Sequence, residues 1–444
     1  MLMNEVLIKG GQLLLSLSIL ILLHEMGHFI AARMFKVRVE KFYLFFNPWF
    51  TLFKIRRGET EYGLGWLPLG GYVKISGMID ESMDKEQMKL PPQPWEFRTK
   101  PAWQRLIIML GGIIMNVLLG IFIYWMILYA SGEQYFPTQN LKYGISTNDV
   151  GREIGFRDGD QIVSVDGSSI ENFNKIPAAI IIDMAKNVTV LRDGNEVNIP
   201  IDDADLKKVI DSRSGTDFIS IRFPFMVNEV MPGSTAKDLK LQQHDIVIAV
   251  NNEPAMYYQE VREKLQKYKG QDVSITVWRD HHAFTSTTKL ASDGLLGVKI
   301  VPPDKFITTK EIKYSLLSSF PAGLNKAWQT LSGYVKQFAL IFSPTVQGYK
   351  HVGGFISIAN AFDPTWDWGA FWAFTGFLSI ALAFMNLLPI PALDGGHVLF
   401  TLVEMLTRRK PSEKFLEYAQ VAGMMILLAL IVYANGNDIL HLFR

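Results

Sequence analysis

Two histidines and a glutamate lie close together in an apolar stretch near the N-terminus. The segment His24-Glu25-Met26-Gly27-His28 follows a run of leucines and isoleucines. In an α-helix, residues four apart share a face, so both imidazoles can reach one ion while Glu25 projects beside them. Neutral imidazoles are nitrogen ligands for Zn²⁺, and a carboxylate can move a proton from an attacking water to a leaving amine. The spacing therefore predicts a hydrolytic zinc site, with His24 and His28 as ligands and Glu25 as general base.

The surroundings of this motif argue against two ordinary helix histidines and a surface glutamate. Ionisable groups in an apolar helix cost roughly 2.5–3.5 kcal/mol each near the middle of a bilayer, and they usually mark a site. The chain contains no cysteine. A metal here must therefore be held by His, Asp or Glu, and disulfides are excluded.

A third ligand is expected, because a catalytic zinc takes three protein ligands and leaves one position open. Asp394 is the candidate, in the segment NLLPIPALDGGH at residues 386–397. Pro389 and Pro391 break a helix there and leave a backbone able to turn toward the first motif. Two alternatives stay open: Asp394 could cap the helix that follows it, or His397 could be the ligand instead.

Four apolar stretches have about the 20 residues that a helix needs to cross a bilayer. They cover residues 13–32, 106–130, 369–388 and 419–433, and the last is the shortest. A cleaved signal peptide fits the first stretch poorly, because Lys9 is the single positive charge before it and the apolar run is too long.

The distribution of Lys and Arg predicts the orientation of these stretches. Basic residues collect at 33–105, and Arg408, Arg409 and Lys410 lie between the last two stretches. By the positive-inside rule both connections face the cytoplasm, which places the termini and residues 131–368 outside. The first and third stretches then run in the same direction, so their ends lie at the same cytoplasmic depth.

The composition bounds the class of protein. Of 444 residues, 49% are hydrophobic and 20% are charged, and the formal net charge is +1. An apolar chain of this length is typical of a membrane protein, and near-neutral charge gives no support for nucleic-acid binding. The bilayer is an expected partner and nucleic acid is not.

A repeat lies between the second and third stretches. The segment GFRDGDQIVSVDGSSI at 155–170 reappears as LKLQQHDIVIAVNNEPA at 239–255. Each copy is followed by a helical stretch and by a strand with a basic turn, VTVLRDGNEVNI and VSITVWRDHHAF. Two copies of one plan predict tandem domains. The alternative is two unrelated strand–turn–strand units, because Gly-Asp turns are common.

The HEMGH motif together with N-x2-P-x-P-x-LDGG resembles the site-2 protease family of intramembrane zinc metalloproteases. The resemblance covers nearly the whole chain. It implies zinc on His24, His28 and Asp394, with Glu25 as general base. The repeated segments resemble PDZ domains of the bacterial type, which bind extended peptides by strand addition. Their place between the central spans is similar to that in the regulator-of-sigma-E branch of the family.

Further segments resemble the family. The Gly-rich stretch GLGWLPLGGYVK at 63–74 is similar to one that forms a membrane-associated β-hairpin, which could hold a substrate backbone extended; an ordinary cytoplasmic hairpin is the alternative. Asn386 could hydrogen-bond a substrate backbone or join two spans. Asn116 occupies a family-like position, with structural and functional roles equally open. The candidate substrate-binding residues are Gly63, Gly65, Asn386, Pro389 and Pro391.

The predicted fold class is a polytopic α-helical membrane protein with four transmembrane helices, a membrane-associated β-hairpin and two inserted PDZ-like α+β domains. Residues 1–132 would hold the first two helices and the hairpin. Residues 133–215 and 216–303 would be the PDZ-like domains, and 304–444 would hold amphipathic linker helices and the last two spans.

The resemblance also implies a function and a location. The expected enzyme is a zinc metalloendopeptidase of the bacterial inner membrane that cuts single-pass membrane proteins already trimmed on the outer side. Anti-sigma factors or signal-peptide remnants would be such substrates, and the PDZ-like pair would exclude untrimmed ones. Two other classes remain open: a catalytically idle scaffold and a metal transporter, which would also place His and Asp in spans.

Overall fold

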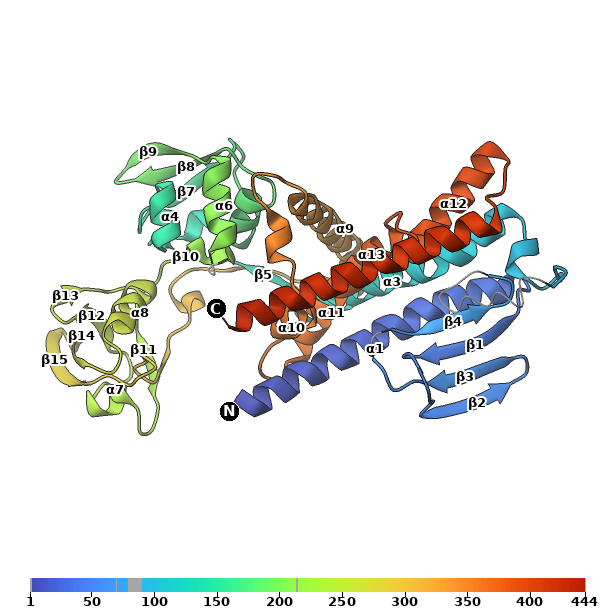
Figure 1. Cartoon of the computed structure of the whole chain (residues 1–444). Helices are drawn as coiled ribbons and strands as arrows, with labels where there is room; N and C mark the ends of the chain where they lie inside the picture. Colours follow the sequence, from blue (N-terminus) through green and yellow to red (C-terminus); the bar gives the residue numbers. More distant parts are fainter. Residues whose placement is uncertain (1, 69, 79–89, 213–214, 444) are drawn as a thin grey trace. The chain divides into compact units, whose positions relative to one another are not determined.

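The computed structural model describes residues 2–68, 70–78, 90–212 and 215–443. The chain divides into two compact units. The first, called here the helical unit, comprises Met1–Gly132, Lys313–Ile341 and Tyr349–Arg444. The second, called the inserted unit, comprises Glu133–Ile312 and Phe342–Gly348. Figure 1 shows the elements of each.

Four helices of the helical unit are long and apolar enough to cross a membrane, among the residues the structure describes. They are α1 (Leu2–Met34), α3 (Ala102–Ser131), α11 (Trp368–Leu387) and α13 (Glu413–Leu442). The four expected stretches are therefore confirmed as helices. The helix α13 is much longer than the expected 419–433, because it continues through polar residues that the apolar run did not include.

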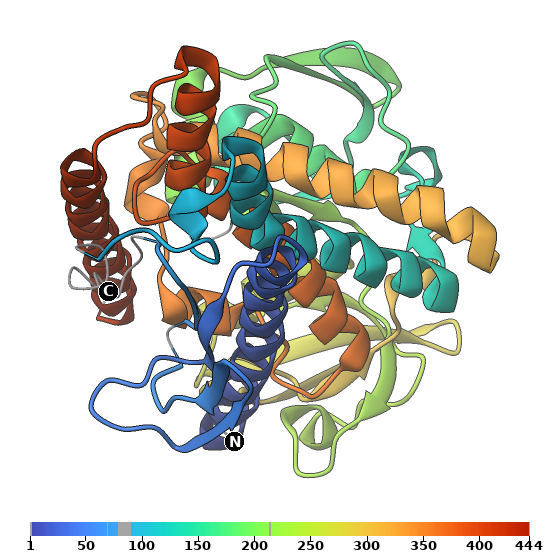
Figure 2. The ribbon, with the colours of Figure 1, turned by 90° about the vertical axis from the view of Figure 1, so that its right-hand side faces the viewer.

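The helix α3 lies at the centre of the helical unit. It contacts α1, α11, α9 (Leu316–Ile341) and α12 (Asp394–Thr407), as Figure 2 also shows. A glycine pair marks a close approach to α1: a Cβ on Gly27 would lie 2.2 Å from the carbonyl oxygen of Gly111. Small residues let two backbones approach in this way. The glycine within the HEMGH motif therefore sets the distance between the two helices.

A four-stranded sheet packs beside the C-terminal half of α1 (Figure 1). Its strands, in the order β2-β3-β1-β4, are β1 (Val39–Leu44), β2 (Phe53–Arg57), β3 (Thr60–Leu64) and β4 (Tyr72–Ile75). The β1–β3 pair is parallel, and the other two pairs are antiparallel.

This topology corrects the hairpin expected over residues 63–74. The two strands of that stretch, β3 and β4, pair with opposite edges of β1 and not with each other. The connection at 65–71 is too long for a tight hairpin turn. It leads the chain from β3, on one edge of β1, to β4, on the other edge. The hairpin that does form is β2–β3, which turns at Gly58 with a positive φ of 59°. Leu69 lies outside the described residues.

The inserted unit contains the sequence repeat. Its first part holds β5 (Glu133–Tyr135), β6 (Ile145–Thr147), α4 (Asp149–Ile154), β7 (Gln161–Val165), α5 (Ile176–Ile181), β8 (Asn187–Arg192), β9 (Asn195–Pro200), α6 (Asp203–Asp211) and β10 (Ile219–Ile221). Its second part holds β11 (Val227–Val230), α7 (Thr235–Asp238), β12 (Ile246–Val250), β13 (Glu253–Pro254), α8 (Tyr258–Lys267), β14 (Asp272–Arg279), β15 (His282–Lys289), β16 (Val298–Ile300) and β17 (Lys310–Ile312). Each part has its own hydrophobic core.

The two parts share one ion pair at matching positions. Asp160 binds Arg192 at 2.8 Å, and Asp245 binds Arg279 at 2.6 Å. In both parts the buried aspartate lies just before a strand of the repeat (β7 or β12), and the arginine ends the antiparallel partner of that strand (β8 or β14). The hydrogen bond to Asp245 raises the pKa of Arg279. The repeated sequence is therefore a repeated structure.

The domain boundaries at 215 and 303 remain predictions. Residues 213–214, beside the first boundary, lie outside the described residues.

Candidate metal centre

Three side chains converge between two helices of the helical unit. The Nε2 atoms of His24 and His28, on α1, lie 3.1 and 3.3 Å from Oδ2 of Asp394, the first residue of α12. The two Nε2 atoms are 3.3 Å apart. Among the described residues this is the one group of three or more His, Cys, Asp or Glu side chains with the spacing of a metal site.

The geometry of this group fits zinc. A tetrahedral site with bonds of 2.0–2.1 Å has edges of about 3.3–3.4 Å between ligand atoms, close to the three distances observed. Oδ2 of Asp394 is buried and has no hydrogen bond of good geometry within the described part of the chain. Three electron-pair donors thus converge on one point, which is the arrangement that a cation at their centre would stabilise.

The loop before α12 delivers Asp394 to the histidines. The helix α11 ends at Leu387, two residues before Pro389, and the loop turns at Ala392, whose φ is 82°. A Cβ on Gly395 would lie 2.2 Å from the carbonyl oxygen of Leu388. The glycine after Asp394 is therefore required for the tight return of the chain.

Both alternatives to Asp394 as a ligand lose support. The N-cap of α12 is Leu393, so Asp394 is already inside the helix and does not cap it. His397 lies one turn further along α12 and is not part of the converging group.

Glu25 lies beside the group and faces the sheet. It is half-buried and interacts electrostatically with both histidines and Asp394. Its carboxylate is within hydrogen-bonding reach of the Val73 backbone on β4. A Cβ on Gly71, just before β4, would lie 3.3 Å from Cγ of Glu25. The sheet therefore closes over the candidate base, a contact that sequence reasoning missed; the adjacent glycines at 70–71 were its one local signal.

The structure brings one candidate substrate-binding residue to the metal group. Nδ2 of Asn386 lies 3.3 Å from Nε2 of His24. Pro389 and Pro391 occupy the loop that leads to Asp394. The end of α11 thus meets the C-terminal half of α1.

Gly63 and Gly65 lie on the sheet and not in the metal group. Gly63 lines an apolar groove of about 280 Å³ that Leu22 of α1 also borders. A Cβ on Gly63 would meet the ring of Tyr43 at 2.3 Å, and one on Gly65 would meet the carbonyl oxygen of Phe46 at 2.2 Å. Packing within the sheet is therefore sufficient to explain both glycines.

One face of α3 supports both histidines, and the sequence did not reveal it. Nδ1 of His28 lies 2.8 Å from the carbonyl oxygen of Ile108, and Nδ1 of His24 lies 3.2 Å from Nδ2 of Asn116. Between these two contacts, Gly112 leaves room for the two rings. Residues 108, 112 and 116 recur at helical spacing and lie on one side of α3.

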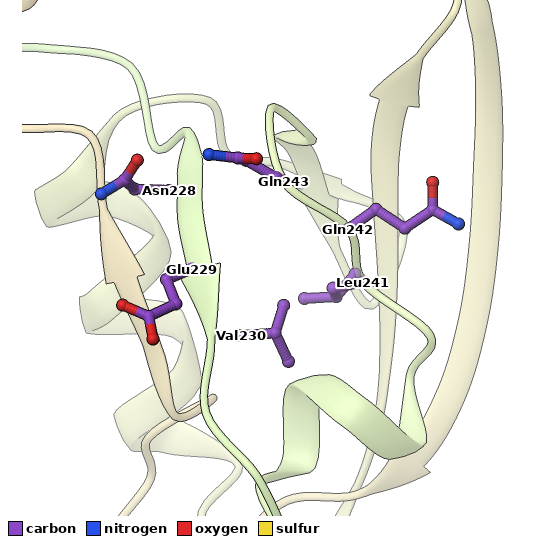
Figure 3. A pocket seen from close by; sticks show the side chains of 6 residues that line it. All are labelled: Asn228, Glu229, Val230, Leu241, Gln242 and Gln243. Carbon is purple, nitrogen blue, oxygen red and sulfur yellow. The ribbon is translucent and has the colours of Figure 1, made fainter.

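A second hollow belongs to the inserted unit. It measures about 560 Å³ and lies between β11 and the loop before β12 (Figure 3). The residues that line it are Asn228, Glu229, Val230, Leu241, Gln242 and Gln243. With one ionisable side chain among them, this hollow offers no metal ligand set and no acid–base pair.

Comparison with known proteins agrees with the chemistry of the metal group. The sequence profile of peptidase family M50 matches residues 12–430. The chain is 27% identical to a putative zinc metalloprotease of Xylella fastidiosa, over 96% of this chain and 98% of that protein. It is 28% identical to protease RseP of Yersinia pestis, over 98% and 99% of the two chains. The regulator of sigma E protease of Haemophilus influenzae is 27% identical over 97% and 98%.

Proposed function

Because the chain belongs to peptidase family M50, the site-2 protease family, we propose that it cuts peptide bonds within the membrane-spanning segment of single-pass membrane proteins. It is a zinc metalloendopeptidase and a membrane protein with four apolar helices. The observation that carries the proposal is the convergence of Asp394 Oδ2 on Nε2 of His24 and His28, at 3.1 and 3.3 Å, where both histidines lie on α1, a helix long enough to span a bilayer.

In this proposal His24, His28 and Asp394 hold the ion and Glu25 is the general base. When bound, Zn²⁺ polarises the scissile carbonyl and lowers the pKa of the attacking water. Glu25 takes the proton of that water and later delivers it to the leaving amine. The place of Glu25 next to His24, and its electrostatic contact with all three candidate ligands, support this role.

We further propose that Asn386 and the loop after it bind the substrate backbone. A peptide bond within a helix is poorly accessible, so a cleavable segment must lose its helical hydrogen bonds and find other partners. The Asn386 amide lies at the metal group and can donate to the substrate carbonyl. Pro389 and Pro391 would shape the neighbouring wall. Gly63, which lines the apolar groove beside Leu22, and Gly65, directly after β3, would border an extended substrate that lies in that groove.

The orientation and the inserted unit complete the proposal. The four apolar helices and the bacterial relatives indicate an inner-membrane protein. The positive-inside pattern supports placing the metal centre toward the cytoplasm and the inserted unit outside. Residues 133–215 and 216–303 would then be PDZ-like domains that exclude substrates not yet trimmed on the outer side. Anti-sigma factors and signal-peptide remnants are the substrate classes proposed.

The other two classes have less support. A transporter or an idle scaffold has no need of a peptidase family's motifs with a glutamate in an apolar helix. Membership of a peptidase family and the intact metal group both favour hydrolysis.

A cleavage assay tests the proposal. A truncated single-span substrate is incubated in liposomes with the wild type, Glu25→Gln and Asp394→Ala, and bound zinc is quantified for each. We expect the wild type to cut within the span. Glu25→Gln should keep zinc and lose at least 10³-fold in rate, an order-of-magnitude expectation for an essential acid–base group. Asp394→Ala should lose both zinc and activity.

Two outcomes would contradict specific parts of the proposal. If Asp394→Ala keeps zinc and activity, the third ligand is elsewhere. If Glu25→Gln cuts as fast as the wild type, another group is the base. Cleavage by the wild type outside the span would refute the intramembrane site itself.

A further inference from the structure

Asn116 is a buried amide of α3 that contacts one candidate ligand. Its side chain has no exposure to solvent, and its Nδ2 lies 3.2 Å from Nδ1 of His24. Its Oδ1 is buried and has no hydrogen-bond partner within the described part of the chain. The backbone carbonyl of Asn116 accepts a hydrogen bond from Ser379 of α11 at 2.7 Å. This residue is therefore held firmly in place, with one half of its amide unpartnered.

In the orientation that the structure shows, the Asn116 amide conflicts with metal binding by His24. His24 directs Nε2 toward Asp394 and His28. A neutral imidazole that gives Nε2 to a metal carries its hydrogen on Nδ1. That hydrogen would face the N–H groups of Asn116, so two donors would meet at 3.2 Å.

Reversing the Asn116 amide removes the conflict. A half-turn about the Cβ–Cγ bond exchanges Oδ1 and Nδ2 without changing the shape of the side chain. Oδ1 then accepts the hydrogen of His24 Nδ1. The side chain still has one unpartnered amide atom, as it had before the turn, so the exchange does not increase the number of unsatisfied buried groups.

His28 already has the corresponding arrangement. Its Nδ1 lies 2.8 Å from the carbonyl oxygen of Ile108, two helical turns before Asn116 on α3. Metal-binding histidines usually donate their second ring N–H to a carbonyl or carboxylate, which fixes the ring and raises its basicity. One face of α3 would then supply the acceptor for each histidine.

We propose that Asn116 is a positioning residue of the metal centre, whose side-chain carbonyl accepts the Nδ1 hydrogen of His24 in the zinc-loaded protein. This inference rests on the ligand set proposed above. Loss of such a partner typically weakens metal binding about 10–100-fold. The expected effect of Asn116 is therefore on zinc affinity and on the orientation of one imidazole, before any effect on the chemical step.

Zinc affinity of the full chain in detergent tests this, measured by competition with a chromophoric chelator. Asn116→Leu keeps the approximate volume and removes the acceptor, so we expect about 10–100-fold weaker zinc binding. Asn116→Asp keeps an acceptor oxygen and, when ionised, has no donor, so we expect an affinity within a few-fold of wild type. With ¹⁵N-labelled histidine, the Nδ1–H signal of His24 should shift in Asn116→Asp and broaden in Asn116→Leu.

Thr375→Val is the matched control. Thr375 makes a buried hydrogen bond of 3.0 Å to Ser16 between α11 and α1, and neither residue is a candidate ligand. Its removal should leave zinc affinity unchanged. If Thr375→Val weakens zinc as much as Asn116→Leu, the effect reflects helix packing and the proposal is overturned.

Two further outcomes would overturn it. Wild-type affinity in Asn116→Leu means that the amide does not support the ligand. Equal weakening in Asn116→Leu and Asn116→Asp means that the amide acts as a donor. Asp394→Ala tests the ligand set separately: retained zinc in that variant places the third ligand elsewhere, whereas lost zinc with a normal Asn116→Leu leaves the proposed ligand set in place and removes this inference alone.

Discussion

At the scale of single residues, the metal centre depends on the glycine at position 112 as much as on the ligands. Gly112 of α3 lies against both histidine rings: a Cβ there would be 2.5 Å from His28 Nε2 and 2.5 Å from His24 Cε1. Real Cβ atoms do not approach other atoms so closely, so either the rings or the helix would have to move.

Gly112→Ala should therefore weaken zinc binding by at least 10-fold, because the added methyl group displaces the two rings. Chelator competition measures this effect. Gly333→Ala on α9 is the matched control, since a Cβ at Gly333 meets nothing within 4 Å. In the control, replacement of the glycine should raise the stability of the helix by about 0.5–1 kcal/mol. Zinc affinity should not change. Normal zinc affinity in Gly112→Ala would contradict the tight packing described.

For Asn386 the expected effect is on the catalytic rate and not on zinc binding. If its amide donates to the substrate carbonyl, Asn386→Leu should lower kcat about 10²–10³-fold, as loss of one such donor does elsewhere, and bound zinc should stay. Steady-state kinetics with zinc analysis would measure both. Loss of zinc in this variant would instead make Asn386 a support for His24, whose Nε2 it contacts at 3.3 Å.

At the scale of elements, the position of Asp394 depends on how α12 is attached to α3. Arg105, in the first turn of α3, binds Glu404 of α12 at 2.5 Å and also donates to the carbonyl oxygen of Lys100 at 3.0 Å. Both charged side chains are largely buried. The helix that carries Asp394 is therefore fixed to the same helix that supports the histidines.

Arg105→Met should destabilise the helical unit by on the order of 3 kcal/mol, because it leaves the carboxylate of Glu404 buried and unpaired. The double variant Arg105→Met with Glu404→Met should recover most of this loss. Chemical unfolding in detergent measures the difference. Lys299→Met, which removes an exposed partner of Glu229, is the control and should change stability by no more than about 1 kcal/mol. Equal losses in the single and double variants would show that the charge pair is not the cause.

The polar end of α13 has a similar structural role. Asp438 accepts hydrogen bonds from the backbone of Ile356 and Ser357, and Asn437 donates to the carbonyl oxygens of Lys350 and Val352. These bonds attach α13 to the segment that precedes α11. They explain why the helix extends well beyond its apolar run.

At the scale of the whole molecule, the long segment of the inserted unit, Glu133–Ile312, begins and ends on one short ribbon. β5 pairs with β17 in antiparallel register, with Tyr135 opposite Lys310. A pair of strands in this register can be closed by a two-residue turn.

Replacing residues 136–309 with Asn-Gly should therefore leave a helical unit that folds and binds zinc. If the PDZ-like pair excludes untrimmed substrates, the shortened protein should cut full-length and trimmed single-span substrates at similar rates. The wild type should prefer trimmed ones by at least 10-fold. Competition between two labelled substrates in liposomes measures this ratio. An unchanged preference would place the filter elsewhere, and loss of zinc would show that the helical unit needs the insert to fold.

Much of this protein was predictable from sequence because its strongest signals are local. The spacing of His24 and His28, four apolar stretches and a repeated strand–turn pattern each depend on helix geometry, bilayer thickness or turn chemistry within a short window. Asp394 could be proposed because two prolines end a helix beside it. The four helices followed these predictions, and the three candidate ligands converge.

The remaining features required contacts between distant segments, which no local pattern encodes. The hairpin expected at 63–74 was wrong because pairing with β1 decides which strands are neighbours. The role of Gly112 and the contacts of Asn116 depend on how closely α3 crosses α1, and the glycine pair Gly27 and Gly111 sets that distance. Sequence thus determined which groups could bind zinc. Only the tertiary structure decided which backbone atoms and amides orient them, because that orientation arises where helices far apart in the chain touch.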